Sequence, residues 1–341
     1  MNAKLKFWRW YSNPLSRHRF SIAKWIFRET PRKLLDSLTV RQPAELPARK
    51  AVFDSYSEEI KQGKLHPATA APVEEMVASD VTEALRQCGV KVFPPVVLRL
   101  AHLPIFLVVS HRDRLQGSSP SGVLLHPKLT PEQAAEIEQF VERQDQGLSA
   151  LAVPLGGLAL FPPMVQIRYP PTMTEIAGHE WCHTHLFFAP LGFGNNILGR
   201  GLGRIEENVC NLVGAEIFSA VAPKYGWDKA SPSAPITEEF NTEMRTIRLR
   251  LDQLLAAGKA EEAEAYLESQ GSFREKFKIR KLNQAYFTFY GSYGGPQAGG
   301  DPTRDYLLAV RSRCANLGEF LRKVKRIRNY KDLVRLAQAA S

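Results

Sequence analysis

The sequence predicts an α+β fold in which a small mixed β-sheet lobe is followed by an α-helical lobe. Short segments rich in β-forming residues are confined to residues 96–161, and helical patterns fill nearly all of the chain after residue 236. Hydrophobic residues make up 44% and charged residues 23%, which is ordinary for a globular protein and argues against a disordered or fibrous chain. With 341 residues, the chain is long enough for two modest domains or for one unit of two lobes.

The first lobe is expected to follow a basic N-terminal extension. Two proline-rich breaks interrupt residues 1–70, so we expect an extension there, and an α/β lobe over residues 71–192. A helical pattern over residues 73–89 opens this lobe, and Gly89 is suited to end the helix. The β-rich runs predict strands at residues 96–100, 105–110, 122–126, 150–154 and 157–161. We expect the last two segments either as two more strands or as a hairpin.

Capping sequences predict where the longer helices begin. A capping box that opens at Thr130 predicts a helix to about residue 146. A second one, at Thr172, predicts a helix that Pro190 ends, and another helix is expected over residues 204–222. A helical lobe is expected over residues 193–341. Its further helices are predicted at residues 238–256, 260–269, 273–293 and 304–334, the last with a break near residue 318.

The formal net charge of +10 is concentrated at the two ends of the chain. Residues 1–33 carry nine Lys/Arg against one acidic residue, and residues 311–335 carry nine against two. Trp8, Trp10 and Trp25 lie among the N-terminal cations, a combination that favours the headgroup layer of an anionic membrane. Peripheral membrane contact is one expectation, and a basic arm that docks on the protein's own surface is the other. No nucleic-acid-binding module is recognisable, so we expect no nucleic-acid partner.

Neither a membrane span nor a secretory signal is expected. Residues 94–110 form the longest apolar stretch, but Arg99, His102 and Pro104 make it too short and too polar to span a bilayer. The basic N-terminus lacks a continuous apolar stretch with a cleavage site. The four cysteines include no CxxC pair, so a reducing compartment fits. We expect a cytoplasmic protein, peripheral at the membrane if its basic arm binds lipid.

The run His179-Glu180-Trp181-Cys182-His183 carries the strongest chemical signal. On a helix, residues four apart lie on one face about 5–6 Å apart, so His179 and His183 can direct ring nitrogens at one tetrahedral zinc ion. Glu180 then stands beside the metal, where its carboxylate can accept a proton from the water that attacks a carbonyl. The spacing predicts a zinc-dependent hydrolase. The alternative is a pair of histidines that only satisfy polar neighbours.

A third metal ligand is expected on the next helix. Glu207 and Asn211 share one face of that helix, which suits a ligand and an amide that orients the site. Gly214 lies one turn further and permits a close approach to the motif helix. Glu206 is the alternative ligand; it lies about 100° away around the helix and is interpreted as a surface carboxylate.

The pairing of the HEWCH motif with a downstream glutamate-bearing helix resembles the gluzincin metallopeptidases, the thermolysin-like and aminopeptidase-like group. The run from Tyr169 to Phe218 is also similar to a bacterial family of membrane-associated HExxH proteins that is not functionally characterised. The resemblance implies a zincin-like fold with zinc bound by His179, His183 and Glu207. It also implies that Glu180 is the general base.

The chain departs from the gluzincin pattern around the third ligand. Gluzincins often place asparagine before the ligand glutamate and aspartate four residues after it, whereas this chain has Glu206 and Asn211. A neutral amide can still orient a ligand, but it makes the site less negative. The exopeptidase motif of the aminopeptidases is not recognisable, so the resemblance does not extend to that activity.

Peptide hydrolysis also needs a hydrogen-bond donor for the developing oxyanion. Tyr286, Tyr290 and Tyr293 recur at helical spacing, and Tyr290 is the candidate donor; the alternative is a core aromatic stripe. The strand over residues 157–161 is expected to align an extended peptide. We therefore predict a zinc-dependent peptidase that acts on peptide or protein substrates. The alternative is a non-catalytic zincin-fold protein that binds membranes or an acidic partner through its basic termini.

Overall fold

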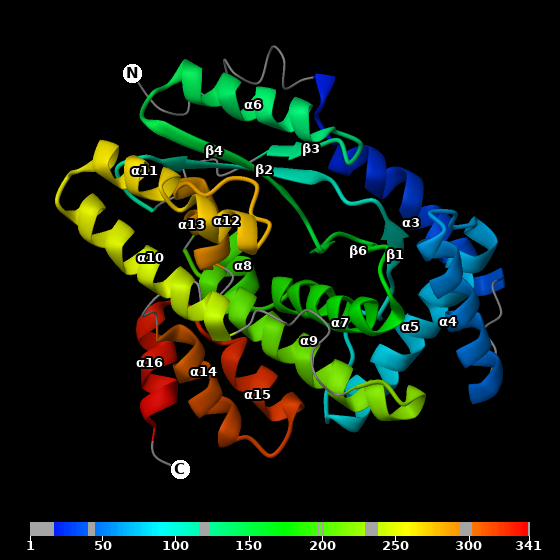
Figure 1. Ribbon diagram of the computed structural model, residues 1–341. Coiled ribbons are helices and arrows are strands. Elements are labelled where there is room, and N and C mark those ends of the chain that lie inside the picture. Colours follow the sequence, from blue (N-terminus) through cyan, green and yellow to red (C-terminus); the bar gives the residue numbers. More distant parts are fainter. Residues whose placement is uncertain are drawn as a thin grey trace. The chain divides into compact units, whose positions relative to one another are not determined.

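The computed structural model describes residues 17–39, 45–115, 123–196, 198–199, 201–228, 238–292 and 302–339. Within these residues the chain is mixed α and β and mostly helical, with two sheets of three strands each (Figure 1). The predicted α+β class is therefore confirmed. None of the helices in the described ranges is both long enough and apolar enough to cross a bilayer.

The chain divides into two compact units, each assembled from three separate stretches of sequence. The first unit contains Met1–Ser21, Pro104–Leu155 and Ile236–Asp301; the second contains Ile22–Leu103, Gly156–Pro235 and Pro302–Ser341. This division differs from the three consecutive segments expected from the sequence, residues 1–70, 71–192 and 193–341. The difference arises because elements distant in the chain share one core within each unit.

The first unit is an antiparallel sheet with helices on both faces. Its described elements are β2 (Ile105–His111), β3 (Val123–Leu125), α6 (Pro131–Gln144), β4 (Leu148–Pro154), α10 (Glu238–Ala256), α11 (Ala260–Glu268), α12 (Gly271–Lys276) and α13 (Gln284–Ser292). The strand order is β3-β2-β4. Strand β2 pairs with β4 from Ile105 opposite Pro154 to His111 opposite Leu148.

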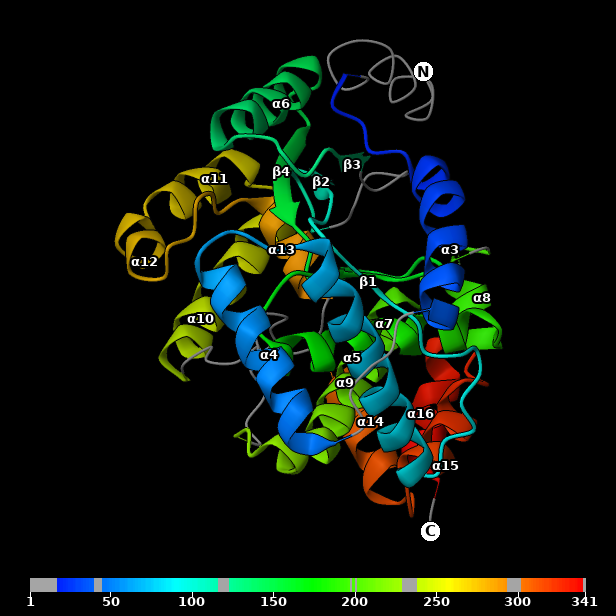
Figure 2. The same cartoon turned by 90° about the vertical axis from the view of Figure 1, so that its right-hand side faces the viewer.

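Side-chain alternation along β2 explains why both faces of this sheet are covered. Leu107 and Val109 are buried in an apolar cluster that includes Ile137 of α6. Phe106 points to the other face, where its ring centroid lies 5.9 Å from that of Phe289 on α13. Figures 1 and 2 accordingly show α6 and α13 on opposite sides of β2 and β4.

Two local predictions in this unit have different outcomes. The capping box at Thr130 is present, because its hydroxyl accepts from Gln133 N and the Gln133 side chain accepts from Thr130 N. The continuous helix predicted over residues 273–293 is wrong, since the structure divides it into α12 and α13. Lys278 adopts a left-handed conformation (φ 53°) between them, and the Asn283 side chain accepts a backbone N–H at the start of α13.

The second unit packs helices around a small mixed sheet. Its described elements are α3 (Ile22–Thr39), α4 (Leu46–Lys61), α5 (Pro67–Gln87), β1 (Arg99–Ala101), β5 (Gly157–Leu158), β6 (Met164–Gln166), α7 (Pro170–Phe187), α8 (Pro190–Asn196), α9 (Gly203–Tyr225), α14 (Thr303–Ser312), α15 (Leu317–Val324) and α16 (Tyr330–Gln338). The strand order is β1-β6-β5, with β6 parallel to β1 and antiparallel to β5. Of the two alternatives for residues 150–154 and 157–161, the hairpin is wrong, because β4 pairs with β2 and β5 pairs with β6.

Helices α7 and α9 cross at unusually close range because two glycines lie at the contact. A Cβ atom on Gly214 would lie 2.8 Å from the carbonyl oxygen of Glu175 and 3.2 Å from Cβ of His179. A Cβ atom on Gly178 would lie 3.2 Å from Cβ of Ile217. The expected role of Gly214 in a close approach to the motif helix is therefore confirmed, and Gly178 shares that role.

Residues 22–39 and 45–70 are packed into the second unit, so the expectation of an extension does not hold there. Phe53 and Tyr56 of α4 are buried in the main apolar cluster, with 4% and 0% of their surface exposed. Two prolines that suggested breaks, Pro47 and Pro67, lie instead in the first turns of α4 and α5. Proline suits that position because the first helical N–H groups have no partner inside the helix.

A buried network of ion pairs holds α3 against α5 and β1. Lys33 Nζ donates to Glu74 Oε2 at 3.1 Å and to Glu75 Oε1 at 2.6 Å. Arg99 donates to Glu74 at 3.0 Å and to Glu29 at 3.1 Å. The second oxygen of Glu74 accepts a backbone N–H of β1 at 2.8 Å. Every charged end in this network is matched, which is the condition for burying charges without a large cost.

Candidate metal centre

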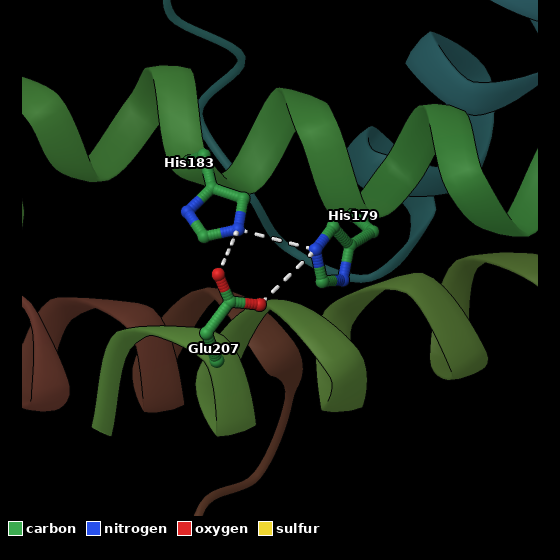
Figure 3. Close-up of side chains that lie close together, drawn as sticks. All are labelled: His179, His183 and Glu207. Atoms are coloured by element: carbon green, nitrogen blue, oxygen red, sulfur yellow. Dashed lines mark hydrogen bonds and ion pairs between the residues drawn. The ribbon is translucent and has the colours of Figure 1, made fainter. Parts of the chain in front are cut away.

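Helix α7 carries the HExxH motif, and one side of the helix is anchored in the core. Pro170 occupies its first turn, so the helix begins there and not at the capping box predicted at Thr172. Trp181 is buried, and its indole N–H donates to a backbone carbonyl at 2.9 Å. His179 and His183 lie on the side that faces α9 (Figure 3).

Three side chains from α7 and α9 converge on one point (Figure 3). The Nε2 atoms of His179 and His183 lie 3.1 Å apart. The carboxylate of Glu207 meets them from α9, with Oε2 at 3.6 Å from His179 Nε2 and Oε1 at 3.5 Å from His183 Nε2. Ligands about 2.0–2.1 Å from a tetrahedral zinc ion stand roughly 3.3 Å from one another. The three separations are close to that value, and the structure thus brings together the three candidate ligands named from the sequence.

The chemistry of this cluster fits a divalent metal better than it fits a structural role. Glu207 Oε2 is buried and has no hydrogen-bond partner in the described part of the chain. The two imidazole nitrogens face each other, an arrangement that needs a proton or a metal ion between them. Two nitrogens and one carboxylate oxygen form a donor set typical of catalytic zinc sites. The three side chains are 14–20% exposed, so a small ion can reach them.

His183 is held by a chain of two hydrogen bonds that ends on α8. Its Nδ1 hydrogen-bonds to Glu206 Oε1 at 3.0 Å, and Asn195 Nδ2 donates to Glu206 Oε2 at 2.8 Å. Glu206 is only 2% exposed, so its interpretation as a surface carboxylate is wrong. It lies on the far side of His183 from Glu207, where it fixes the ring orientation and tautomer, as carboxylates behind metal-binding histidines do.

His179 has its own orienting partner on α9. The Asn211 side chain hydrogen-bonds to it, in agreement with the amide role expected from the sequence. Burial and the neighbouring His183 lower the pKa of His179 to about 4. Burial would also lower the pKa of His183, but the carboxylates of Glu207 and Glu206 outweigh it and raise that pKa well above the usual value. One imidazole is therefore neutral and ready to accept a metal or a proton from the other.

Glu180 is buried beside the cluster and lies against the backbone of β5. Only 6% of its surface is exposed. A Cβ atom on Gly157 would overlap the carboxylate of Glu180, so this carboxylate occupies space that any other residue at position 157 would fill. Burial raises the pKa of Glu180 to about 8, with the charge of Glu207 adding to the effect against the opposing His183. In the absence of a cation this carboxyl therefore favours its protonated form.

Tyr290 belongs to the first unit and not to the unit that contains the cluster. It lies on α13, where its ring centroid is 4.4 Å from that of Tyr286 and 5.0 Å from that of Phe289. These contacts are those of a packed aromatic group. Its role as oxyanion donor stays a prediction, and Tyr293 lies outside the described residues.

Asn195 and Gly157 are residues of the site that the sequence did not reveal. Asn195 lies eleven residues before Glu206, and nothing in the local pattern connects the two. Gly157 carried a signal, the pair Gly156-Gly157 just before the motif helix, but that pair was interpreted as a hairpin turn. Comparisons of the chain with protein-family models, with curated proteins and with solved structures return no match.

Proposed function

We propose that the protein is a zinc-dependent peptidase whose centre is formed by His179, His183 and Glu207, and that its second unit is zincin-like. The observation that carries this proposal is the convergence of the three donor atoms within 4.8 Å of one another, next to a buried glutamate that is not one of them. A site that only stores a metal needs no such base, so Glu180 favours a catalyst.

Each residue of the proposed site has a defined task in the reaction. When bound, the zinc ion supplies a Lewis acid that acidifies water and polarises a carbonyl. Glu180 accepts the proton of the attacking water and returns it to the leaving amine, a role that its place beside the three donor atoms supports. Glu206 and Asn195 hold the His183 ring in place, and Asn211 holds His179.

The proposed substrate is a peptide in extended conformation. Strand β5 is one of the two edge strands of its sheet and carries Gly157, which lies against Glu180. A peptide that adds to this edge by main-chain hydrogen bonds would pass next to the proposed base. Because such bonds use the backbone alone, they favour an unstructured polypeptide segment over a folded substrate.

The decisive experiment replaces the base without removing the metal. Glu180→Gln keeps the shape of the side chain, so bound zinc should remain at about one ion per chain. Hydrolysis of an unstructured polypeptide should fall by about 10²–10⁴-fold, the usual contribution of a positioned acid–base group. Glu175→Gln, on the same helix, is the matched control and should retain activity. An activity that survives Glu180→Gln unchanged points to a contaminating protease.

A second candidate function, peripheral membrane binding without catalysis, is favoured by the outer face of α3. Phe27 is 82% exposed, and Leu34 and Leu35 are 59% and 60% exposed. The guanidinium side chains of Arg28 and Arg32 lie beside them and are 61% and 62% exposed. Apolar and cationic side chains in this combination suit an anionic lipid surface.

A cleavage assay on wild-type protein that is verified to hold zinc distinguishes the two candidate functions. If this protein cleaves nothing across a broad peptide library, the peptidase proposal fails and the binding role remains. Vesicles of anionic phospholipid test that role directly, since Phe27→Ser should weaken their binding whereas Leu249→Ser, an exposed leucine of α10, should not.

A further inference from the structure

A polar cavity lies in the first unit, and all of its walls come from that unit. Its volume is about 350 Å³, within the range of roughly 300–1,000 Å³ that is usual for small-molecule sites. The walls are the end of α6, the start of β4, α11, α12 and the residues that lead into α13. No residue of the proposed metal centre takes part.

Most of the charges in the cavity wall are already matched by one another. Arg112 is held by both carboxylate oxygens of Glu264. Lys281 donates to Glu142 Oε1 at 2.8 Å. The two charges within each pair neutralise each other. The other groups in the wall therefore decide which ligand charges the cavity favours.

Two polar atoms in the wall are buried and lack a partner among the described residues. Gln284 is fully buried, and its amide nitrogen donates to the backbone oxygen of Arg112 at 3.0 Å, which fixes the orientation of the amide and leaves Oε1 unpartnered. Arg274 Nε is the second such atom, and its guanidinium forms no ion pair with a described residue. Buried polar groups in native proteins are normally satisfied, so these two point to a missing partner.

The other unmatched groups define the shape and charge of that partner. Glu268 is an exposed carboxylate in the wall, and the described residues provide no cation for it. Leu148, Leu267 and Leu282 give the same cavity an apolar surface. One free cation, one free anion, one free acceptor and an aliphatic wall therefore remain.

We propose that this cavity binds a small zwitterion, either a free amino acid or a dipeptide with an aliphatic side chain. The ligand carboxylate pairs with Arg274, and the ligand ammonium group donates to Gln284 Oε1 and pairs with Glu268. The aliphatic side chain packs against the three leucines. The site stands independently of the proposed peptidase activity, although the products of peptide hydrolysis belong to this chemical class and would bind as effectors.

Calorimetric titration of the full chain with L-leucyl-L-leucine tests the proposal. Saturable binding is expected, and it should be equal in wild type and in His183→Ala, which removes the metal centre as a competing site. Arg274→Gln should weaken binding by about tenfold or more, because it removes a charge-assisted hydrogen bond. Arg245→Gln, an exposed arginine of α10 outside the cavity, is the matched control and should change nothing.

A second titration assigns the two ends of the ligand. N-acetyl-leucine keeps the carboxylate but lacks the ammonium group. Glu268→Gln should therefore weaken binding of the dipeptide and leave binding of N-acetyl-leucine unchanged. Arg274→Gln should weaken binding of both ligands. Thermal unfolding verifies that both variants are folded. The proposal is overturned if folded wild type shows no saturable binding of either ligand, or if Arg274→Gln binds the dipeptide as tightly as wild type.

Discussion

Two buried polar clusters in the second unit differ in how their charges are matched. In the network around Lys33, Glu74 and Arg99, each carboxylate meets a cation or a backbone N–H. In the cluster around His179, His183 and Glu207, one carboxylate oxygen has no hydrogen-bond partner, and two imidazole nitrogens face each other at 3.1 Å. The first cluster is complete as it stands, whereas the second leaves donor atoms that could hold a cation. Buried polar groups that all have partners indicate a structural role, whereas buried polar groups that lack partners indicate a binding site.

Replacing a proposed metal ligand should produce the largest effect. His179→Ala, His183→Ala and Glu207→Ala should each reduce bound zinc from about one ion per chain to a small fraction, because catalytic zinc sites have only three protein ligands. Metal analysis of the purified variants measures this. If Glu207→Ala retained full occupancy while Glu206→Ala lost it, the assignment of the third ligand would be wrong.

Breaking the matched network should reduce stability and leave metal binding intact. Lys33→Met removes the buried ammonium group, so its partners Glu74 and Glu75 lose a cation. The free energy of unfolding should fall by roughly 3–5 kcal/mol, the usual cost of breaking a buried ion pair. Urea unfolding measures it. Lys61→Met is the control, because Lys61 and its partner Glu58 are 58% and 59% exposed and exposed pairs of this kind contribute little to stability.

Filling the space next to the base should affect catalysis alone. Gly157→Ala places a methyl group where the Glu180 carboxylate lies, so the base must move. A displacement of this kind lowers activity by about 10²-fold while zinc content stays at the wild-type level. Steady-state kinetics and metal analysis on the same sample test this. Gly156→Ala, whose Cβ would be 3.9 Å from its nearest neighbour, is the control and should remain active.

Weakening the support of His183 should give the smallest effect. Glu206→Gln keeps the hydrogen-bonding shape but removes the charge behind the imidazole, and Asn195→Ala removes the group that positions Glu206. Each change should lower zinc affinity by about 10–100-fold, the usual effect of losing a partner behind a metal ligand. Competition with a chelator of known affinity measures it. An unchanged affinity in both variants would show that the ring of His183 needs no support.

The sequence predicted those parts of the site that depend on local geometry. The candidate ligands His179 and His183 follow from helical spacing, and Glu207 and Asn211 follow from the face of a single helix. Glu206 was misread because its burial depends on contact with Asn195 of α8, which helical spacing within α9 does not contain. The place of Gly157 depends on the pairing of β5 with β6, and a glycine pair fits a tight turn equally well.

For the fold as well, the sequence predicted the features that depend on neighbouring residues and missed those that depend on distant ones. The boundaries of α10 and the capping box of α6 depend on neighbouring residues, and both are confirmed. The packing of α3 and α4 depends on partners far along the chain, such as Glu74 and Arg99 for Lys33. No local pattern identifies such partners, so a region with basic composition and prolines was taken for an extension.

Because each unit is assembled from separate stretches of sequence, its parts are synthesised at different times. Residues 179–207, which carry the proposed metal ligands, leave the ribosome well before α14, α15 and α16. These late helices contribute Leu307, Phe320 and Leu333 to the same apolar cluster that holds Cys182 and Val209 of α7 and α9. The helices of the metal centre are therefore synthesised long before their core is closed. Because domains fold as units during synthesis, stable metal loading should wait until α16 has been synthesised.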